Sequence, residues 1–197
     1  MVANDWKSRE YTNCKVTKKH SVSRTLYLDN LTTPKYKFKE IIHFTKDPLS
    51  DKHMAICIGI NPAKAEQNID PTNINLIKLL FDNYDGYILL NIYPEITKNA
   101  KKVNFKDDEN INFTKNLDAI INENKTEDII LFFGRTTIVP STFIELINSC
   151  VNNNRIVKIT THDGEFTHPA RRSINLTDYS SDYVRSFIKI TLKNIIK

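Results

Sequence analysis

The sequence is poor in glycine and cysteine and has no long apolar run. Only 4 of its 197 residues are glycine, and the three cysteines are odd in number, far apart and form no C-x-x-C pair. This argues against a disulfide framework, a zinc site and an iron–sulfur cluster. No stretch approaches the roughly 18 apolar residues of a membrane span, and the N-terminus has no apolar segment typical of a signal peptide. We therefore expect a cytoplasmic protein without a metal or other cofactor.

What the chain does contain suits a packed domain. Hydrophobic residues make up 40% and charged residues 26% of the sequence, and the formal net charge is +5. This length is typical of one domain, so we expect residues 1–197 to form a single unit. The positive charge permits a polyanionic partner, although charge alone favours a solvated lysine-rich surface.

The hydrophobic pattern changes near residue 51. Residues 1–50 are basic, and "YKFKE" alternates apolar and charged residues, which predicts a β extension of two antiparallel strands. Residues 51–197 alternate short apolar runs with amphipathic segments. Strands are expected at 54–60, 86–93, 128–134 and 155–160. Helices are expected at 72–84, with Thr72 as N-cap, at 113–125, at 140–154 and from about 178 to 196.

This alternation is typical of βαβ units and predicts an α/β fold. We expect a three-layer αβα sandwich with a short, mostly parallel central sheet. Ligands of such sheets bind beyond the carboxyl ends of the strands. The residues at those ends are Gly59-Ile60-Asn61-Pro62, Asn91, Gly134-Arg135, and a loop with His162, Asp163, His168, Arg171 and Arg172.

Each of these residues also has a plain structural interpretation. Asn61-Pro62 is a common turn dipeptide, and Asn91 could cap a strand end. A histidine in a polar loop is usually solvated. The segment "HDGEFTH" offers too few ligands for a metal site.

Taken together, the strand-end segments resemble the uracil-DNA glycosylase superfamily. "GINPA" (59–63) is similar to its first motif, in the asparagine-bearing variant of the mismatch-specific members. "YILLN" (87–91) is similar to the strand whose terminal asparagine reads uracil. "IILFFG" (129–134) resembles the following core strand, and "THPARRS" (167–173) resembles the second motif, a loop that enters the minor groove.

A closer resemblance is to an uncharacterised bacterial and phage family within or near this fold. Its pattern is Asn-Pro-small-x-Ala, then Asp-Pro-Thr, a strand ending in Asn, and a terminal Asp-Gly-x-x-x-His-Pro loop. In this sequence the first two segments begin at Asn61 and Asp70. The strand ends at Asn91, and the terminal loop begins at Asp163. The resemblance covers about residues 54–173.

The resemblance implies hydrolysis of the N-glycosidic bond of uracil in DNA, after the base is flipped out of the stack. The catalytic residues would be Asn61, holding the attacking water, and His168, donating to the uracil O2 as negative charge develops. Asn91 would offer a donor and an acceptor to the base edge. The implied substrate contacts are Gly59, Ile60, Pro62, Asn91 and Tyr93. The implied DNA contacts are Lys64, Arg135, Arg171, Arg172 and Ser173.

The chain departs from the superfamily pattern at three places. Ala63 stands where the most uracil-selective members carry a tyrosine that blocks thymine, and Arg172 stands where an intercalating leucine is usual. No aromatic residue follows the first motif to stack on the flipped base. Tyr93 is the substitute we consider, since Phe81 has the spacing of a core residue.

Three hypotheses about function therefore stay open. The first is a monomeric DNA glycosylase that removes uracil from single- or double-stranded DNA, with a protein inhibitor or a replication partner as further partners. The second is a DNA-binding module of the same fold without turnover, which the missing stacking aromatic favours. The third is a hydrolase or transferase of free nucleosides or nucleotides.

Overall fold

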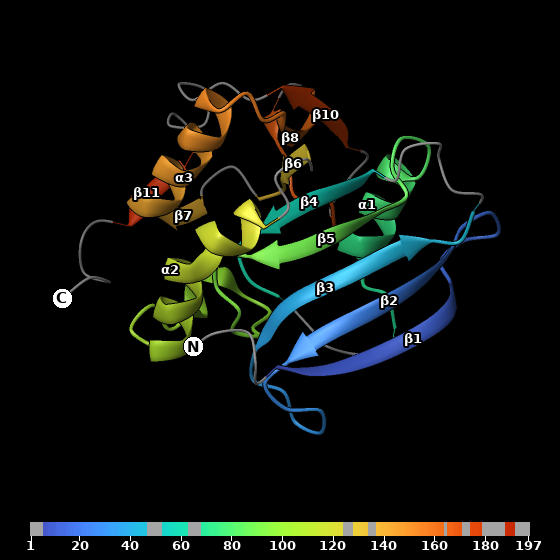
Figure 1. The fold of residues 1–197 in the computed structure, drawn as a ribbon, viewed down its shortest axis with the longest axis horizontal. Helices are drawn as coiled ribbons and strands as arrows, with labels where there is room; N and C mark the ends of the chain where they lie inside the picture. Colours follow the sequence, from blue (N-terminus) through green and yellow to red (C-terminus); the bar gives the residue numbers. More distant parts are fainter. Residues whose placement is uncertain are drawn as a thin grey trace.

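A sheet of nine strands runs through the molecule, in the order β1-β2-β3-β5-β4-β6-β8-β10, with β9 paired to β8. The structure is a computed structural model, shown in Figure 1. It describes residues 6–46, 53–62, 68–123, 128–133, 137–163, 165–170, 174–178 and 188–191. The candidate site lies at the centre of this sheet, and further strands extend the sheet on both sides.

Four parallel strands form the centre of the sheet, in the order β5-β4-β6-β8. They are β4 (Met54–Gly59), β5 (Gly86–Asn91), β6 (Asp128–Leu131) and β8 (Val157–His162). β4, β5 and β6 lie within runs that the sequence predicts as strands, and β8 begins inside its predicted run and extends two residues past it, to His162. β5 lies on one side of β4 and the later strands lie on the other, so the order reverses between β4 and β6. Such a topological switch point is where open α/β sheets bind ligands.

Antiparallel strands continue the sheet on both sides. The N-terminal strands are β1 (Lys7–Lys15), β2 (Ser21–Leu28) and β3 (Lys37–Phe44), and β3 pairs with β5. On the far side are β9 (Glu165–Phe166) and β10 (Asn175–Asp178). The N-terminal extension therefore has three strands where two were expected, and the whole sheet is wider than the short one expected.

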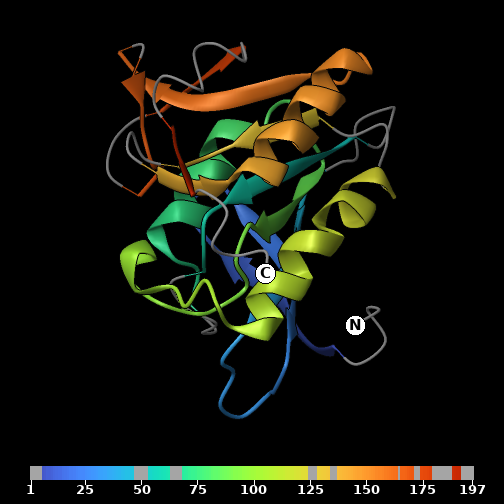
Figure 2. The same ribbon diagram turned by 90° about the vertical axis from the view of Figure 1, so that its left-hand side faces the viewer.

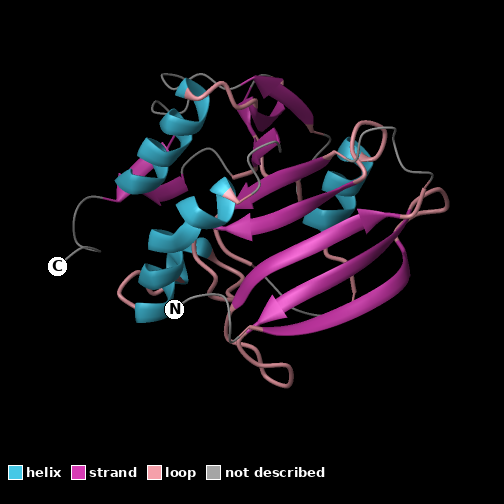
Figure 3. Cartoon of the chain, viewed as in Figure 1, coloured by secondary structure: helices cyan, strands magenta, loops and turns pink. Residues whose placement is uncertain are grey.

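Helices pack on both faces of the central strands. α1 (Pro71–Leu80) covers one face, where it buries Leu76, Ile77 and Leu80 against side chains of β3, β4 and β5. α2 (Asp108–Asn122) and α3 (Ser141–Asn152) pack against the other face. Figures 2 and 3 show α2 and α3 together on one side of the sheet and α1 on the other. The α/β class is confirmed.

The cap of α1 differs from the one expected. The N-cap is Asp70, whose side chain accepts a hydrogen bond from the backbone N–H of Asn73, and Pro71 opens the helix. Proline suits the first helical position because its fixed φ is helical and it lacks an N–H that would be unsatisfied there. Thr72 therefore lies inside the helix.

The predicted C-terminal helix is wrong over residues 188–191. These residues form β11 (Ile188–Thr191), which pairs in parallel with β7 (Thr137–Pro140) in a separate two-stranded sheet. Isoleucine and threonine are β-branched and favour strands, and the pairing with β7 outweighs a helical spacing. A short 3-10 helix, η2 (Ala100–Lys102), completes the described elements. Within the described ranges, no helix combines the length and apolar character that a bilayer crossing requires.

Candidate functional site

The candidate site lies at the carboxyl ends of β4 and β6, on the face covered by α1. Gly59 is the last residue of β4, and Phe132 directly follows β6. A Cβ atom at Gly59 would lie 2.6 Å from Cζ of Phe132 and 2.9 Å from Oδ1 of Asn91. Only glycine therefore lets the phenyl ring and the amide approach the backbone of β4 this closely.

Asn91 ends β5 beside Gly59 and is 4% exposed. Its side chain shares the sheet face of Tyr87 and Leu89, because side chains alternate along a strand. No hydrogen bond joins its amide to another residue in the described part of the chain. Because the side chain lies at the topological switch point of the sheet, its amide is a candidate for reading a ligand. It could offer one acceptor and one donor.

His168 joins the group through a contact with Phe132. Its ring meets the Phe132 ring edge to face, with 5.9 Å between the centroids. The backbone N–H of Ala170 donates to Nδ1 of His168 over 3.2 Å. Nδ1 is therefore the acceptor nitrogen, and in the neutral ring the proton lies on Nε2. The histidine is thus held in the tautomer that can donate from Nε2.

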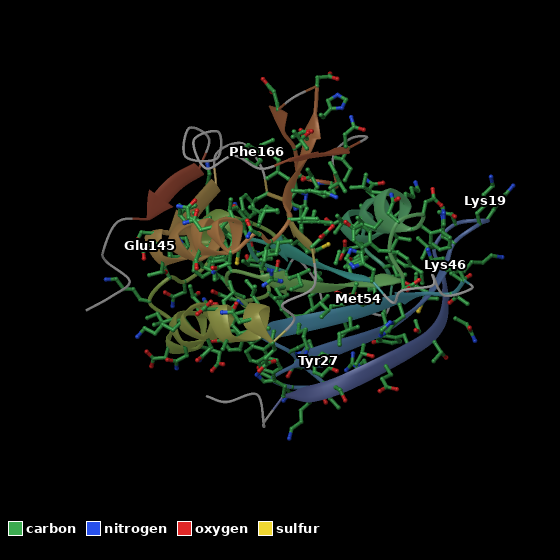
Figure 4. The ribbon with its side chains drawn as sticks, turned by 45° about the horizontal axis from the view of Figure 1, so that its top comes forward. Lys19, Tyr27, Lys46, Met54, Glu145 and Phe166 are labelled. Carbon is green, nitrogen blue, oxygen red and sulfur yellow. The ribbon has the colours of Figure 1, made fainter. Side chains whose placement is uncertain are left out.

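Three hydrogen bonds fix the loop that carries His168. Thr167 pairs with Thr160 of β8 through a backbone bond of 3.1 Å and through the Thr160 hydroxyl, which donates to the Thr167 carbonyl at 2.7 Å. On the other side, Nδ2 of Asn75 in α1 donates to the Pro169 carbonyl at 2.5 Å. Phe166 of β9, labelled in Figure 4, packs into the core beside Phe133. The loop is held by both the sheet and α1.

Asn61 acts first as a clamp between two loops. Its Nδ2 donates to the Thr97 carbonyl at 2.5 Å and to the Pro62 carbonyl at 3.3 Å, while the Thr97 N–H donates to the same Pro62 carbonyl at 2.9 Å. These bonds orient the amide. The nitrogen of Asn61 therefore has the structural role that is expected of a turn residue. Its Oδ1 accepts no hydrogen bond from the described residues and could accept one from water.

The other expected substrate contacts are not all at the site. Tyr93 is 1% exposed and lies in the core on the α2 and α3 side, with its ring 5.0 Å from that of Phe105. Ile60 also packs against that core, and Pro62 serves as a backbone acceptor. Of the predicted contacts, the structure therefore groups Gly59, Asn91 and His168, and it does not group Tyr93 with them.

The predicted DNA contacts Lys64, Arg135, Arg171, Arg172 and Ser173 lie outside the described residues. His162 and Asp163 lie at the end of β8, where Nε2 of His162 is 3.3 Å from Oδ2 of the exposed Asp163. Within the described ranges, no group of three or more His, Cys, Asp or Glu side chains has the arrangement needed to hold a metal ion.

Phe132 is the residue that sequence reasoning missed. The run "DIILFFG" predicts one strand over residues 128–134, whereas β6 ends at Leu131. Phe132 is 3% exposed and lies between Gly59 and His168. The signal available in the sequence was its place directly after the strand that adjoins the expected switch point.

A buried ionic cluster was also missed. Glu40 is 0% exposed and accepts hydrogen bonds from Nε of Arg24 and from Nζ of Lys37, both at 2.8 Å. Phe38 is an extra residue in β3 opposite β2, and such a bulge turns Lys37 toward the face of Glu40. Burial alone would raise the pKa of Glu40, but the charges of Lys37 and Arg24 outweigh it and hold the pKa below its ordinary value. Glu40 is therefore ionised at neutral pH.

Comparison with known proteins assigns a family to the chain. A family model described as "Protein of unknown function (DUF1643)" matches residues 43–170, and the chain belongs to this family. No curated protein and no solved structure matches the chain. The matched region includes Gly59, Asn91, Phe132 and His168 and ends before Arg171.

Proposed function

We propose that this DUF1643 protein is a DNA glycosylase that hydrolyses the N-glycosidic bond of uracil in DNA. The observation that carries the proposal is the grouping of a buried amide, a phenyl ring and a donor histidine around Gly59. An aromatic face and a few directed polar groups are what recognition of a flipped base requires. The packing of helices on both sheet faces supports a three-layer sandwich of the uracil-DNA glycosylase kind.

The chemistry assigns each residue one task. Breaking the bond leaves negative charge on the departing base, and Nε2–H of His168 would donate to the uracil O2 as that charge develops. The amide of Asn91 would accept from N3–H and donate to O4 of uracil, and the ring of Phe132 would stack on the base. Asn61 would accept a hydrogen bond from the attacking water through Oδ1, with its nitrogen held by Thr97 and Pro62.

The reaction as proposed uses only these side chains and water. An amide is no general base, so stabilisation of the leaving base would supply most of the rate. We place the protein in the cytoplasm, acting as a monomer on single- or double-stranded DNA. Ala63 leaves the exclusion of thymine to other residues.

The test is strand scission at a single uracil. The protein is incubated with a labelled oligonucleotide holding one uracil, and alkali then cleaves any abasic site; the same oligonucleotide with thymine is the control. We expect scission at uracil. Retained DNA binding without scission by the folded protein would contradict the enzyme proposal.

A second candidate, a module that binds a flipped base without turnover, is favoured by one observation. The Asn61 nitrogen is fully used in clamping the loops at residues 62 and 97. If Asn61 serves only this clamp, Asn61→Ala should lower stability and leave tight binding of uracil-containing DNA. The two candidates then differ in whether scission occurs at all.

A further inference from the structure

The first turn of α1 is attached to β3 and β5 through buried polar contacts of Asn73. Nδ2 of Asn73 donates to Oε1 of Glu40 at 3.2 Å, and the hydroxyl of Tyr87 donates to Oδ1 of Asn73 at 2.8 Å. Asn73 is 1% exposed. Its amide thus bridges β3 and β5, and it fixes where the helix begins relative to the sheet.

Glu40 is itself held from both sides. Arg24 of β2 and Lys37 of β3 each donate to one of its oxygens, and both cations are 2% exposed. A buried ion pair is weak evidence for stability, because desolvation offsets much of the attraction between the charges. Such a network instead restricts the groups that it holds to one arrangement.

The same part of α1 also holds the His168 loop. Asn75, two residues beyond Asn73, donates to the Pro169 carbonyl, and the next residue, Ala170, donates to Nδ1 of His168. A continuous set of hydrogen bonds and covalent links therefore runs from Glu40, through the start of α1, to the imidazole.

We infer that Asn75 and the Arg24–Glu40–Lys37 cluster are positioning residues that set the place and the tautomer of His168. Arg24, Lys37 and Glu40 precede residue 43, where the family match begins, so the N-terminal extension contributes to the site from outside the matched region. The consequence for base release rests on the proposed function, whereas the effect on the histidine ring does not.

The test compares Asn75→Ala with a matched control. Asn75 is half-buried, so its loss should leave the fold intact. Asn116 lies on the exposed side of α2 and, among the described residues, donates only to the Asn112 carbonyl of its own helix, so Asn116→Ala is the control. Both are measured by ¹⁵N NMR of the histidine rings at pH 8, where a free imidazole is neutral. His168→Gln identifies the His168 signals among those of the five histidines.

We expect wild-type His168 to show a protonated Nε2 and an unprotonated Nδ1. Asn75→Ala should move these signals toward a mixture of tautomers, and Asn116→Ala should not. In the uracil assay Asn75→Ala should lower kcat by about tenfold or more, with KM changed by less than about twofold. Glu40→Gln, if folded, should move the His168 signals in the same direction.

The outcomes separate the two proposals. Unchanged His168 signals in Asn75→Ala would overturn the positioning role, whatever the activity. Shifted signals in a protein that releases no uracil would support the positioning role and contradict the proposed glycosylase. A wild-type His168 protonated on Nδ1 would overturn the inference at its first step.

Discussion

The ring of His168 stands edge-on to the ring of Phe132, with 5.9 Å between the centroids and 65° between the planes. Phe132 in turn lies against Gly59, where a Cβ atom would come within 2.6 Å of it. Three segments far apart in the sequence therefore meet ring to ring and ring to backbone. A substitution in any one of these three segments should therefore displace the contacting residues of the other two.

Replacing Phe132 by leucine should weaken catalysis more than it weakens the fold. Loss of stacking on a base costs about 1–3 kcal/mol, which corresponds to about 5- to 150-fold in kcat/KM. Phe143→Leu is the matched control, because Phe143 is a buried core residue of α3, on the opposite face of the sheet. Uracil release and urea unfolding are measured for both. Equal losses of kcat/KM in the two variants would argue against a stacking role for Phe132.

Gly59→Ala should displace both Phe132 and Asn91. We expect a loss of about 1–3 kcal/mol of unfolding free energy from overpacking, together with a drop in kcat per folded molecule. Gly86→Ala is the control, because a Cβ there would meet the Ile42 carbonyl oxygen, at the opposite end of β5. That variant should lose stability and keep the kcat of its folded fraction. If Gly86→Ala lowers kcat as much as Gly59→Ala does, the effect of Gly59→Ala is not specific to the site.

Asn91→Asp should remove discrimination between uracil and cytosine. A carboxylate only accepts hydrogen bonds, so it has no donor for O4 of uracil and would accept from the amino group of cytosine. We expect uracil release to fall by about 10²-fold or more, with the ratio of uracil to cytosine release falling further. The check is a pair of oligonucleotides that differ only at that base. An unchanged ratio would show that Asn91 does not read the base edge.

Glu40→Gln should change how stability depends on pH. The pKa of Glu40 is held below its ordinary value, so the ionised carboxylate stabilises the fold above the unfolded pKa of about 4.3. This contribution is lost as the pH falls through the folded pKa. At pH 7 the variant should be less stable by about 3–5 kcal/mol, because Arg24 and Lys37 lose their counter-charge.

Urea unfolding at several pH values measures this difference. The gap between wild type and Glu40→Gln should be constant from about pH 7 down to about pH 5 and should narrow in more acidic solution. A gap that widens on acidification would contradict an ionised, stabilising Glu40. Asp163 is an exposed carboxylate at the end of β8, and Asp163→Asn should show no comparable gap.

The central strands and most of the helices could be predicted from sequence, and the reason is their periodicity. The runs that became β4, β5 and β6 are largely continuous and apolar because helices cover both faces. The strand β11 could not be found this way, because its four residues lie in a segment with helical spacing and are paired with the distant β7. Pairing between distant segments leaves no local signal.

The sequence predicts the site residues that lie at strand ends. It does not predict contacts between residues of different strands. Asn91 and His168 follow from strand ends and from the loop after β8. Phe132 was counted as part of a strand because an apolar residue at a strand end has the same pattern as a core residue. Glu40 was hidden because its partners Arg24 and Lys37 come from two other positions in the N-terminal strands, one of them turned inward by a bulge.

The role of His168 in base release is tested by comparing the release of free uracil by wild type and by His168→Ala in single-turnover experiments, with the free base measured by chromatography. We expect wild type to release uracil and His168→Ala to release it more slowly by about 10²–10³-fold, while the affinity of the variant for the DNA is nearly unchanged. Equal rates in the two proteins, or no release by a folded wild type that binds the DNA, would contradict this expectation.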